Sequence, residues 1–144
     1  MDLRPLDEIT SVAPMIDPAD VAALAEGGIT TLICNRPDAE VPPSHQAEAM
    51  RQAAEAAGLE FVYNPLAMPN LTMAAIDEQA DAIDGAEGRV LAYCASGTRS
   101  SVLWALAMAG RLRTDEIMEA LEGAGYHLPQ LRGQVDMLAK EREG

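Results

Sequence analysis

Short apolar runs alternate along this chain with segments in which apolar residues recur at helical spacing. Four such runs, at 9–13, 29–34, 60–63 and 89–93, are bounded by turn residues and predict strands. Between them lie helical patterns such as 73–83, whose apolar face is formed by Met73, Ile76, Ala80 and Ile83. This alternation predicts a three-layer α/β/α fold in which helices cover a four-stranded, mainly parallel sheet.

The run at 89–93 is predicted to be the most buried strand. Its centre is apolar without alternation, as in a strand that is covered on both faces. The helix predicted next, at 101–109, is apolar almost all round and is therefore expected at the centre of the domain. The loop at 94–100 that joins the two thus lies over the core.

The remaining segments predict packing elements. Ser44 is a candidate cap for a helix that ends at Gly58. Two amphipathic helices follow residue 110, and we assign no chemistry to their apolar residues: Ile117, Met118, Leu121, Leu128, Leu131, Val135 and Leu138. With 144 residues and no internal repeat, residues 1–144 are expected to form a single domain.

Charge and composition exclude several classes of partner. Only 10 basic residues accompany 23 acidic ones, which gives a net charge of -13, so binding to nucleic acid or to an anionic membrane is not expected. Aromatic residues make up 3% of the chain, which argues against base stacking. A small anionic substrate would have to be attracted by local dipoles and a local arginine.

Targeting signals and metal-ligand patterns are not evident. Met1 to Pro5 contain no apolar signal run, and no stretch reaches membrane-spanning length, so a cytoplasmic location is expected. The two cysteines are far apart and show no metal-ligand spacing, which indicates a reducing compartment and neither metal nor cofactor. The sequence does not indicate an oligomeric state.

The loop after the run at 89–93 carries the candidate chemistry. It reads Cys94, Ala95, Ser96, Gly97, Thr98, Arg99 and Ser100. The free N–H groups at the start of the next helix point back at the strand end and form an anion site. Those dipoles and the guanidinium of Arg99 favour thiolate over thiol at Cys94, which is therefore a candidate nucleophile, and Arg99 can bind two oxygens of an oxyanion. Ser100 can hydrogen-bond the sulfur. The alternative is a buried, inert thiol.

A second group of candidates follows the run at 29–34. Ligands of open α/β sheets bind beyond the carboxyl ends of the strands, so Asn35, Arg36 and Asp38 are candidates for a wall of the same site. Arg36 would add a second cation, and Asp38 would orient Arg99. The alternative is a proline-containing turn stabilised by local hydrogen bonds.

Residues 93–101 (YCASGTRSS) resemble the active-site loop of cysteine-based phosphatases and rhodanese-type sulfurtransferases. Together with 10–15 (TSVAPM), 31–40 (TLICNRPDAE) and 100–106 (SSVLWAL), they resemble the bacterial phosphatase-like domain of the beta-lactamase-hydrolase-like family. The resemblance implies a dual-specificity-phosphatase-like fold with strand order 1-4-2-3, Cys94 as nucleophile and Arg99 as oxyanion ligand. Some members are described as candidate sulfur transferases, and some are fused to a metallo-hydrolase module linked to sulfide metabolism, which implies a functional partner there.

Three departures from the phosphatase pattern favour sulfane-sulfur transfer through a Cys94 persulfide. Four residues separate Cys94 from Arg99, one fewer than in phosphatases, and Tyr93 replaces the usual histidine. The stretch at 64–70, where phosphatases carry an aspartic acid, contains no acid. The alternatives are a phosphatase that acts through a cysteinyl-phosphate and an anion-sensing binding module.

Two further sequence features bear on these alternatives. Asp38 and Glu40 are the only nearby carboxylates that could supply a general acid to a phosphatase. Cys34 ends a neighbouring strand of the implied sheet, and it is either a resolving thiol or a small buried residue.

Overall fold

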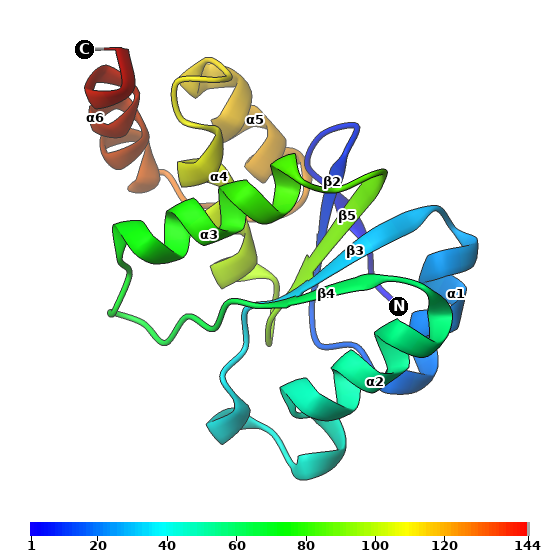
Figure 1. Ribbon diagram of the computed structural model, residues 1–144. Coiled ribbons are helices and arrows are strands. Elements are labelled where there is room, and N and C mark those ends of the chain that lie inside the picture. Colours follow the sequence, from blue (N-terminus) through cyan, green and yellow to red (C-terminus); the bar gives the residue numbers. More distant parts are fainter. Residues whose placement is uncertain (144) are drawn as a thin grey trace.

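The computed structural model describes residues 1–143, which form one sheet with helices on both faces (Figure 1). The strands are β1 (Arg4–Pro5), β2 (Thr10–Ala13), β3 (Ile29–Cys34), β4 (Glu60–Tyr63) and β5 (Arg89–Tyr93). The helices are α1 (Val21–Glu26), α2 (Ala47–Ala57), α3 (Met73–Asp84), α4 (Thr98–Met108), α5 (Thr114–Gly123) and α6 (Leu131–Glu143). Short 3-10 turns lie at Pro18–Asp20, Asp38–Glu40 and Pro43–His45.

Within residues 1–143 the sheet has five strands in the order β1-β2-β5-β3-β4. Strand β5 lies at the centre and pairs in parallel with β2 and β3, and β3 pairs in parallel with β4. This arrangement confirms the predicted three-layer class and the order 1-4-2-3 of the four longer strands. All four end at the same edge of the sheet, which places the loops that follow them side by side.

The expectation of four strands was one strand short. Arg4 and Pro5 pair antiparallel with Val12 and Ser11 and so add β1 to the edge of the sheet. A two-residue strand that contains a proline has no hydrophobic alternation to reveal it, and proline is tolerated only at such an edge. The tertiary pairing with β2 therefore creates this strand.

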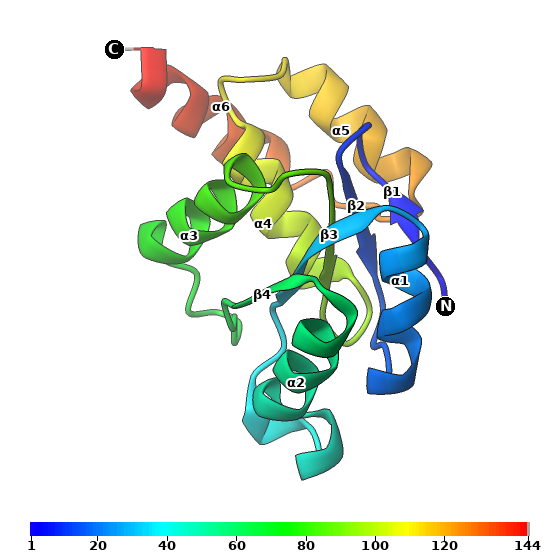
Figure 2. The ribbon, with the colours of Figure 1, turned by 45° about the vertical axis from the view of Figure 1, so that its right-hand side comes forward.

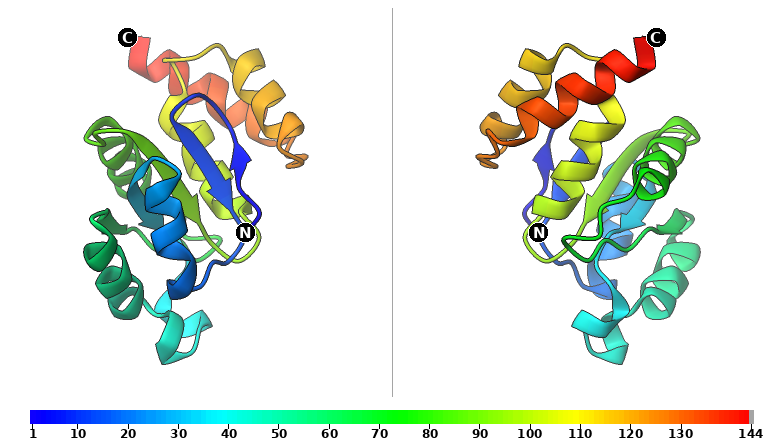
Figure 3. Two further views of the ribbon diagram at one scale, coloured as in Figure 1. Left: turned by 90° about the vertical axis from the view of Figure 1, so that its right-hand side faces the viewer. Right: turned by 90° about the vertical axis from the view of Figure 1, so that its left-hand side faces the viewer.

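Two apolar cores lie on opposite faces of the sheet. Helices α1 and α2 cover one face, where Leu24 and Met50 pack with Leu32, Leu91 and Tyr93 of the strands. Helices α3 to α6 cover the other face, around α4, which is buried from Ser100 to Met108 (Figure 2). The two opposite views of Figure 3 show α1 nearer the viewer in one and α4 and α6 nearer in the other. Strand β5 is thus buried on both faces, as its sequence predicts.

Two helix starts differ from the predictions. Helix α4 begins at Thr98 rather than at residue 101, because Gly97 already turns the chain and Thr98, Arg99 and Ser100 form the first helical turn. Ser44 does not cap α2, which begins at Ala47. The N–H of Ala47 instead donates to Asp38 Oδ1 at 2.7 Å, so a residue of the preceding loop satisfies this helix end.

No helix among residues 1–143 is both long enough and apolar enough to cross a membrane.

Candidate active site

Cys94 follows β5 at the carboxyl edge of the sheet and is fully buried. Its own N–H donates to Ala13 O at 3.4 Å, and the N–H of Met15 donates to Ala95 O at 3.2 Å. These bonds tie the start of the loop to the chain that leaves β2. The central position of β5 therefore fixes Cys94 between the ends of two neighbouring strands.

The Cys94 sulfur receives a backbone hydrogen bond from within the loop. The N–H of Gly97 donates to Cys94 Sγ at 3.1 Å. Gly97 has φ +92°, a left-handed conformation that side chains disfavour, and it is the residue that precedes α4. Thr98 and Ser96 hold the outer side of the turn, with Ser96 Oγ donating to Thr98 Oγ1 at 3.0 Å. The loop thus bends sharply enough to direct an N–H group at the sulfur.

Arg99 leaves the first turn of α4 and is anchored by two distant segments. Its Nη1 and Nη2 donate to the two carboxylate oxygens of Glu40 at 2.8 and 2.9 Å, and Nη1 also donates to Leu66 O at 2.9 Å. The side chain is 16% exposed, so it lies mostly inside the molecule. The loop that follows β4 thus contacts Arg99 through a backbone carbonyl, although it contains no acid.

Glu40 lies between two guanidinium groups. Arg36 Nε donates to Glu40 Oε1 at 3.2 Å, the same oxygen that accepts from Arg99 Nη2. Hydrogen bonding by Arg99 lowers the pKa of Glu40, and the same bond raises the pKa of Arg99, to which the nearby Cys94 sulfur adds a smaller contribution. Glu40 is therefore ionised at neutral pH and acts as a counter-ion, not as a proton donor, in this arrangement.

Asn35 and Ser100 lie behind the loop in a buried amide network. Ser100 Oγ donates to Asn35 Oδ1 at 2.8 Å, so the expected bond from Ser100 to the sulfur is replaced by one to the residue that follows β3. Gln79 of α3 donates to Asn35 Oδ1 and accepts from the side-chain amides of Asn35 and Asn64. All four side chains are buried. Asn35 therefore supports the loop from beneath rather than lining a wall.

Asp38 does not orient Arg99, contrary to the sequence interpretation. Its carboxylate accepts from the N–H of Ala47, and its own N–H donates to Tyr63 Oη at 2.9 Å. Both contacts fix the segment after β3. The carboxylate that reaches Arg99 belongs to Glu40, two residues further along, because the short 3-10 turn at Asp38–Glu40 directs the two side chains differently.

Cys34 is a free, buried thiol. Its Sγ donates to Arg36 O at 3.4 Å, and burial raises the pKa of the thiol. Its side chain packs in the core beneath α1 and α2, with Tyr93. These surroundings keep Cys34 protonated and fit a small buried residue better than a resolving thiolate.

Gln79 and Tyr126 are site-supporting residues that the sequence analysis missed. Gln79 interrupts the apolar face between Ile76 and Ile83, and a polar residue on such a face was the available signal. Tyr126 Oη donates to Ser96 O at 2.9 Å. Nothing in the sequence around Tyr126 indicates that contact, since it lies thirty residues away from its partner.

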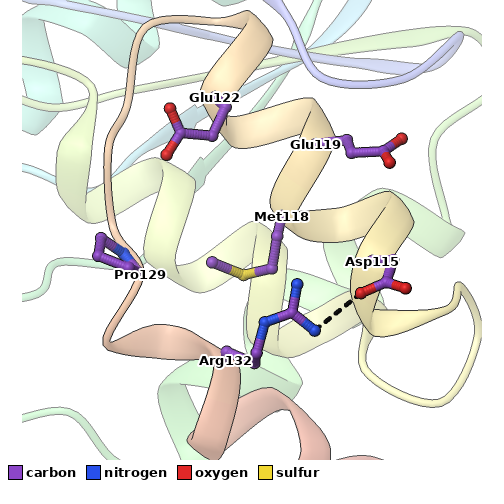
Figure 4. A pocket seen from close by; sticks show the side chains of 6 residues that line it. All are labelled: Asp115, Met118, Glu119, Glu122, Pro129 and Arg132. Atoms are coloured by element: carbon purple, nitrogen blue, oxygen red, sulfur yellow. Dashed lines mark hydrogen bonds and ion pairs between the residues drawn. The ribbon is translucent and has the colours of Figure 1, made fainter.

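Other hollows differ in character from the Cys94 loop. One of about 400 Å³ lies between α5 and the start of α6 and is lined by Asp115, Met118, Glu119, Glu122, Pro129 and Arg132 (Figure 4). Arg132 is already paired with Asp115 there at 2.8 Å, so the acidic lining is unsuited to an anion. Across residues 1–143, no group of three or more His, Cys, Asp or Glu side chains is arranged to hold a metal ion.

Comparison with protein families identifies the chain. Residues 2–111 match the model of the phosphatase-like domain of the beta-lactamase hydrolase-like protein. The chain belongs to this family. The beta-lactamase hydrolase-like protein of Agrobacterium fabrum is 34% identical over 117 residues, which are 80% of this chain and 27% of that protein. The corresponding protein of Xylella fastidiosa strain Temecula1 is 31% identical over 130 residues, 89% of this chain and 30% of that protein. The chain thus spans under a third of these relatives.

Solved structures show the same fold over nearly the whole chain. A candidate phosphatase from Neisseria meningitidis superposes with a TM-score of 0.81 at 34% identity and covers 96% of this chain and 99% of its own. The P. aeruginosa protein TpbA, solved in complex with pTyr, superposes with a TM-score of 0.69 at 15% identity, over 99% and 93% of the two chains. At that identity the likeness is one of fold.

Proposed function

We propose that this domain is a cysteine-dependent hydrolase in which the Cys94 thiolate attacks the phosphorus of a small phosphoester. One observation carries the proposal: a backbone N–H donates to Cys94 Sγ, and the neighbouring Arg99 is held in place by Glu40 and Leu66. A dipole and a guanidinium beside a thiol are the conditions that activate a cysteine nucleophile. Ala95, Ser96, Gly97, Thr98 and Ser100 would form the loop that binds the anion, and Arg36 would add positive charge at its rim.

The reaction has two balanced steps. The thiolate forms a P–S bond as the P–O bond to the leaving group breaks, and the leaving group departs with the electron pair. Water then attacks phosphorus, the P–S bond breaks, phosphate leaves and the thiolate is restored. In both steps the loop N–H groups and the Nε side of Arg99, which Glu40 does not contact, would bind the phosphoryl oxygens.

The leaving group limits the substrates. Positioned general acids contribute about 100- to 10,000-fold when an alkoxide must be protonated. The stretch at 64–70 contains no acid, and Glu40 has a lowered pKa because Arg99 bonds to it. We therefore infer that aryl phosphates, whose leaving groups need little protonation, are hydrolysed much faster than phosphoserine.

Sulfane-sulfur transfer is the second candidate, and the short loop and the missing acid favour it. The Cys94 thiolate would attack the outer sulfur of thiosulfate or of a persulfide. The S–S bond breaks, sulfite or a thiolate leaves with the electron pair, and Cys94 holds a persulfide. An acceptor thiolate or cyanide then takes that sulfur. Neither leaving group needs a proton, so the absence of a general acid does not slow this reaction. The sequence alone favours this chemistry, whereas the relatives and neighbours favour the hydrolase.

One paired assay on a single preparation separates the candidates. Release of phosphate from p-nitrophenyl phosphate and from a phosphoserine peptide is measured beside sulfur transfer from thiosulfate to cyanide. The proposal expects turnover of the aryl phosphate, little turnover of phosphoserine, and an intact-mass gain of one phosphoryl group on Cys94. A mass gain of one sulfur atom with thiosulfate, and no phosphate release, would replace it by sulfur transfer.

Two cysteine variants give the matched control. Cys94→Ser is expected to abolish turnover and the covalent adduct, because a serine hydroxyl is not ionised at neutral pH. Cys34→Ser keeps a donor toward Arg36 O and is expected to retain turnover. Equal activity of Cys94→Ser and the parent protein would reject both candidates, because each requires the Cys94 thiolate. Absence of turnover in the parent protein would instead leave anion binding without catalysis.

A further inference from the structure

The peptide group between Ser96 and Gly97 is held from both ends. Its N–H, contributed by Gly97, donates to Cys94 Sγ at 3.1 Å. Its carbonyl, contributed by Ser96, accepts from Tyr126 Oη at 2.9 Å. The N–H and the C=O of a trans peptide point in opposite directions, so a donor on the carbonyl side fixes the direction of the N–H. The tyrosine hydroxyl and the sulfur are thus linked through one rigid planar unit.

Tyr126 is itself firmly held. It lies in the connection between α5 and α6 and is 6% exposed. Its N–H donates to Leu121 O at 2.9 Å, which closes the end of α5. The guanidinium of Arg4, in the edge strand β1, lies 5.1 Å from the centre of its ring and donates to Ala124 O. Burial raises the pKa of Tyr126, so its hydroxyl remains protonated and can donate at neutral pH.

We propose that Tyr126 is a positioning residue for the Cys94 nucleophile, which it serves by locking the Ser96–Gly97 peptide with its N–H toward the sulfur. Tyr126 lies outside residues 2–111, the part of the chain that matches the family model. The connection between the two C-terminal helices, a region to which the sequence analysis assigned no chemistry, therefore supports the loop.

Two physical effects produce this role. Gly97 has φ +92°, and glycine has no Cβ to oppose rotation, so the loop alone does little to prevent this peptide from flipping. A flipped peptide would present the Ser96 carbonyl to the sulfur and destabilise a thiolate. The hydroxyl also polarises the carbonyl to which it donates, which strengthens the N–H on the opposite side of the same peptide.

The role rests on the proposed function only in that Cys94 reacts as a thiolate. It can therefore be tested without turnover. Tyr126→Phe removes the hydroxyl and keeps the ring and its contact with Arg4. The matched control is Tyr93→Phe, because the hydroxyl of Tyr93 is also buried but makes no hydrogen bond to the loop at 94–100. Both variants are prepared with Cys34→Ser, so that Cys94 is the one thiol that reacts.

The measurement is the rate of alkylation of Cys94 by iodoacetamide from pH 4 to pH 10, followed by intact mass. Relative to the Cys34→Ser parent, Tyr126→Phe is expected to move the midpoint of the profile upward by about half to one pH unit, with alkylation about three- to tenfold slower below the midpoint. The plateau at high pH should be unchanged, since every molecule is then a thiolate. Tyr93→Phe should follow the parent profile.

The outcomes separate the two proposals. A parent midpoint below that of a free cysteine, unchanged in Tyr126→Phe, rejects the role of Tyr126 and leaves the proposed function standing. Equal shifts in both tyrosine variants also reject it, because the effect would then come from loss of any buried hydroxyl. A parent midpoint at or above that of a free cysteine contradicts the thiolate mechanism and this role together. Thermal unfolding of each variant checks that the fold is retained.

Discussion

Glu40 and Arg99 are 59 residues apart in sequence, yet the Glu40 carboxylate accepts from both terminal nitrogens of the Arg99 guanidinium. The pair joins the segment after β3 to the first turn of α4. Its two-point geometry fixes the plane of the guanidinium, which a single contact would leave free to rotate. The orientation of the candidate oxyanion ligand is therefore set from outside the loop that carries it.

Removal of this anchor is predicted to impair catalysis more than stability. Glu40→Gln keeps the length of the side chain but can accept through one oxygen only, so Arg99 should lose its fixed plane. A misplaced catalytic group costs up to about 100-fold in rate, and we expect kcat/KM for an aryl phosphate to fall by about 10- to 100-fold. The control is Glu60→Gln. Glu60 is the first residue of β4, at the end of the strand away from the loop that contacts Arg99. Equal losses in the two variants would contradict a specific role for Glu40.

The same pair predicts a pH dependence of stability. Arg99 lowers the pKa of Glu40 in the folded protein, so folding favours the ionised carboxylate. The stabilisation is fully present above the unfolded pKa of glutamate, about 4.3, and is lost as the pH falls through the lower folded value. Parent and Glu40→Gln should therefore differ in free energy of unfolding at pH 7, by about 1 kcal/mol or less for this partly exposed pair, and converge near pH 3. A difference that grows on acidification would contradict the pairing.

Gln79 is predicted to be a stability residue. Gln79→Leu removes two hydrogen bonds from the buried side chain of Asn35 and one from that of Asn64. Asn35 and Asn64 keep their other partners, so the cost is that of the buried hydrogen bonds lost, and at about 1 kcal/mol for each bond we expect a loss of about 2–3 kcal/mol in urea-induced unfolding. Gln52→Leu, on the exposed face of α2, should change stability by less than about 0.5 kcal/mol. Comparable losses in both variants would argue against the network.

Replacing Gly97 and Gly58 by alanine, one at a time, separates the cost of backbone strain from the cost of a steric clash. Both have positive φ, +92° and +82°, so replacement by alanine strains each backbone by about 1–2 kcal/mol. A Cβ on Gly58 would meet nothing within 4 Å, whereas one on Gly97 would lie 1.9 Å from Tyr126 Oη. Gly97→Ala should therefore cost more in unfolding free energy and should also slow alkylation of Cys94. Equal costs, with unchanged alkylation, would contradict the contact between the loop and Tyr126.

Much of this molecule followed from its sequence. The apolar runs indicated the four parallel strands, most clearly β2, β3 and β5, because burial on both faces of a sheet requires unbroken hydrophobic stretches. The same logic determined that α4 is buried. The position of Cys94 and Arg99 between a buried strand and a buried helix also followed, since both flanking elements have strong patterns of their own.

Only the tertiary structure decided what surrounds the loop. Glu40 rather than Asp38 reaches Arg99, Ser100 bonds to Asn35 rather than to the sulfur, and Tyr126 holds the peptide next to Gly97. These partners lie 59, 65 and 30 residues apart, and no local periodicity encodes them. Hydrophobic pattern depends on burial, which each segment expresses by itself. A side-chain hydrogen bond depends on the distance and angle between two groups, and those exist only once the segments are packed together.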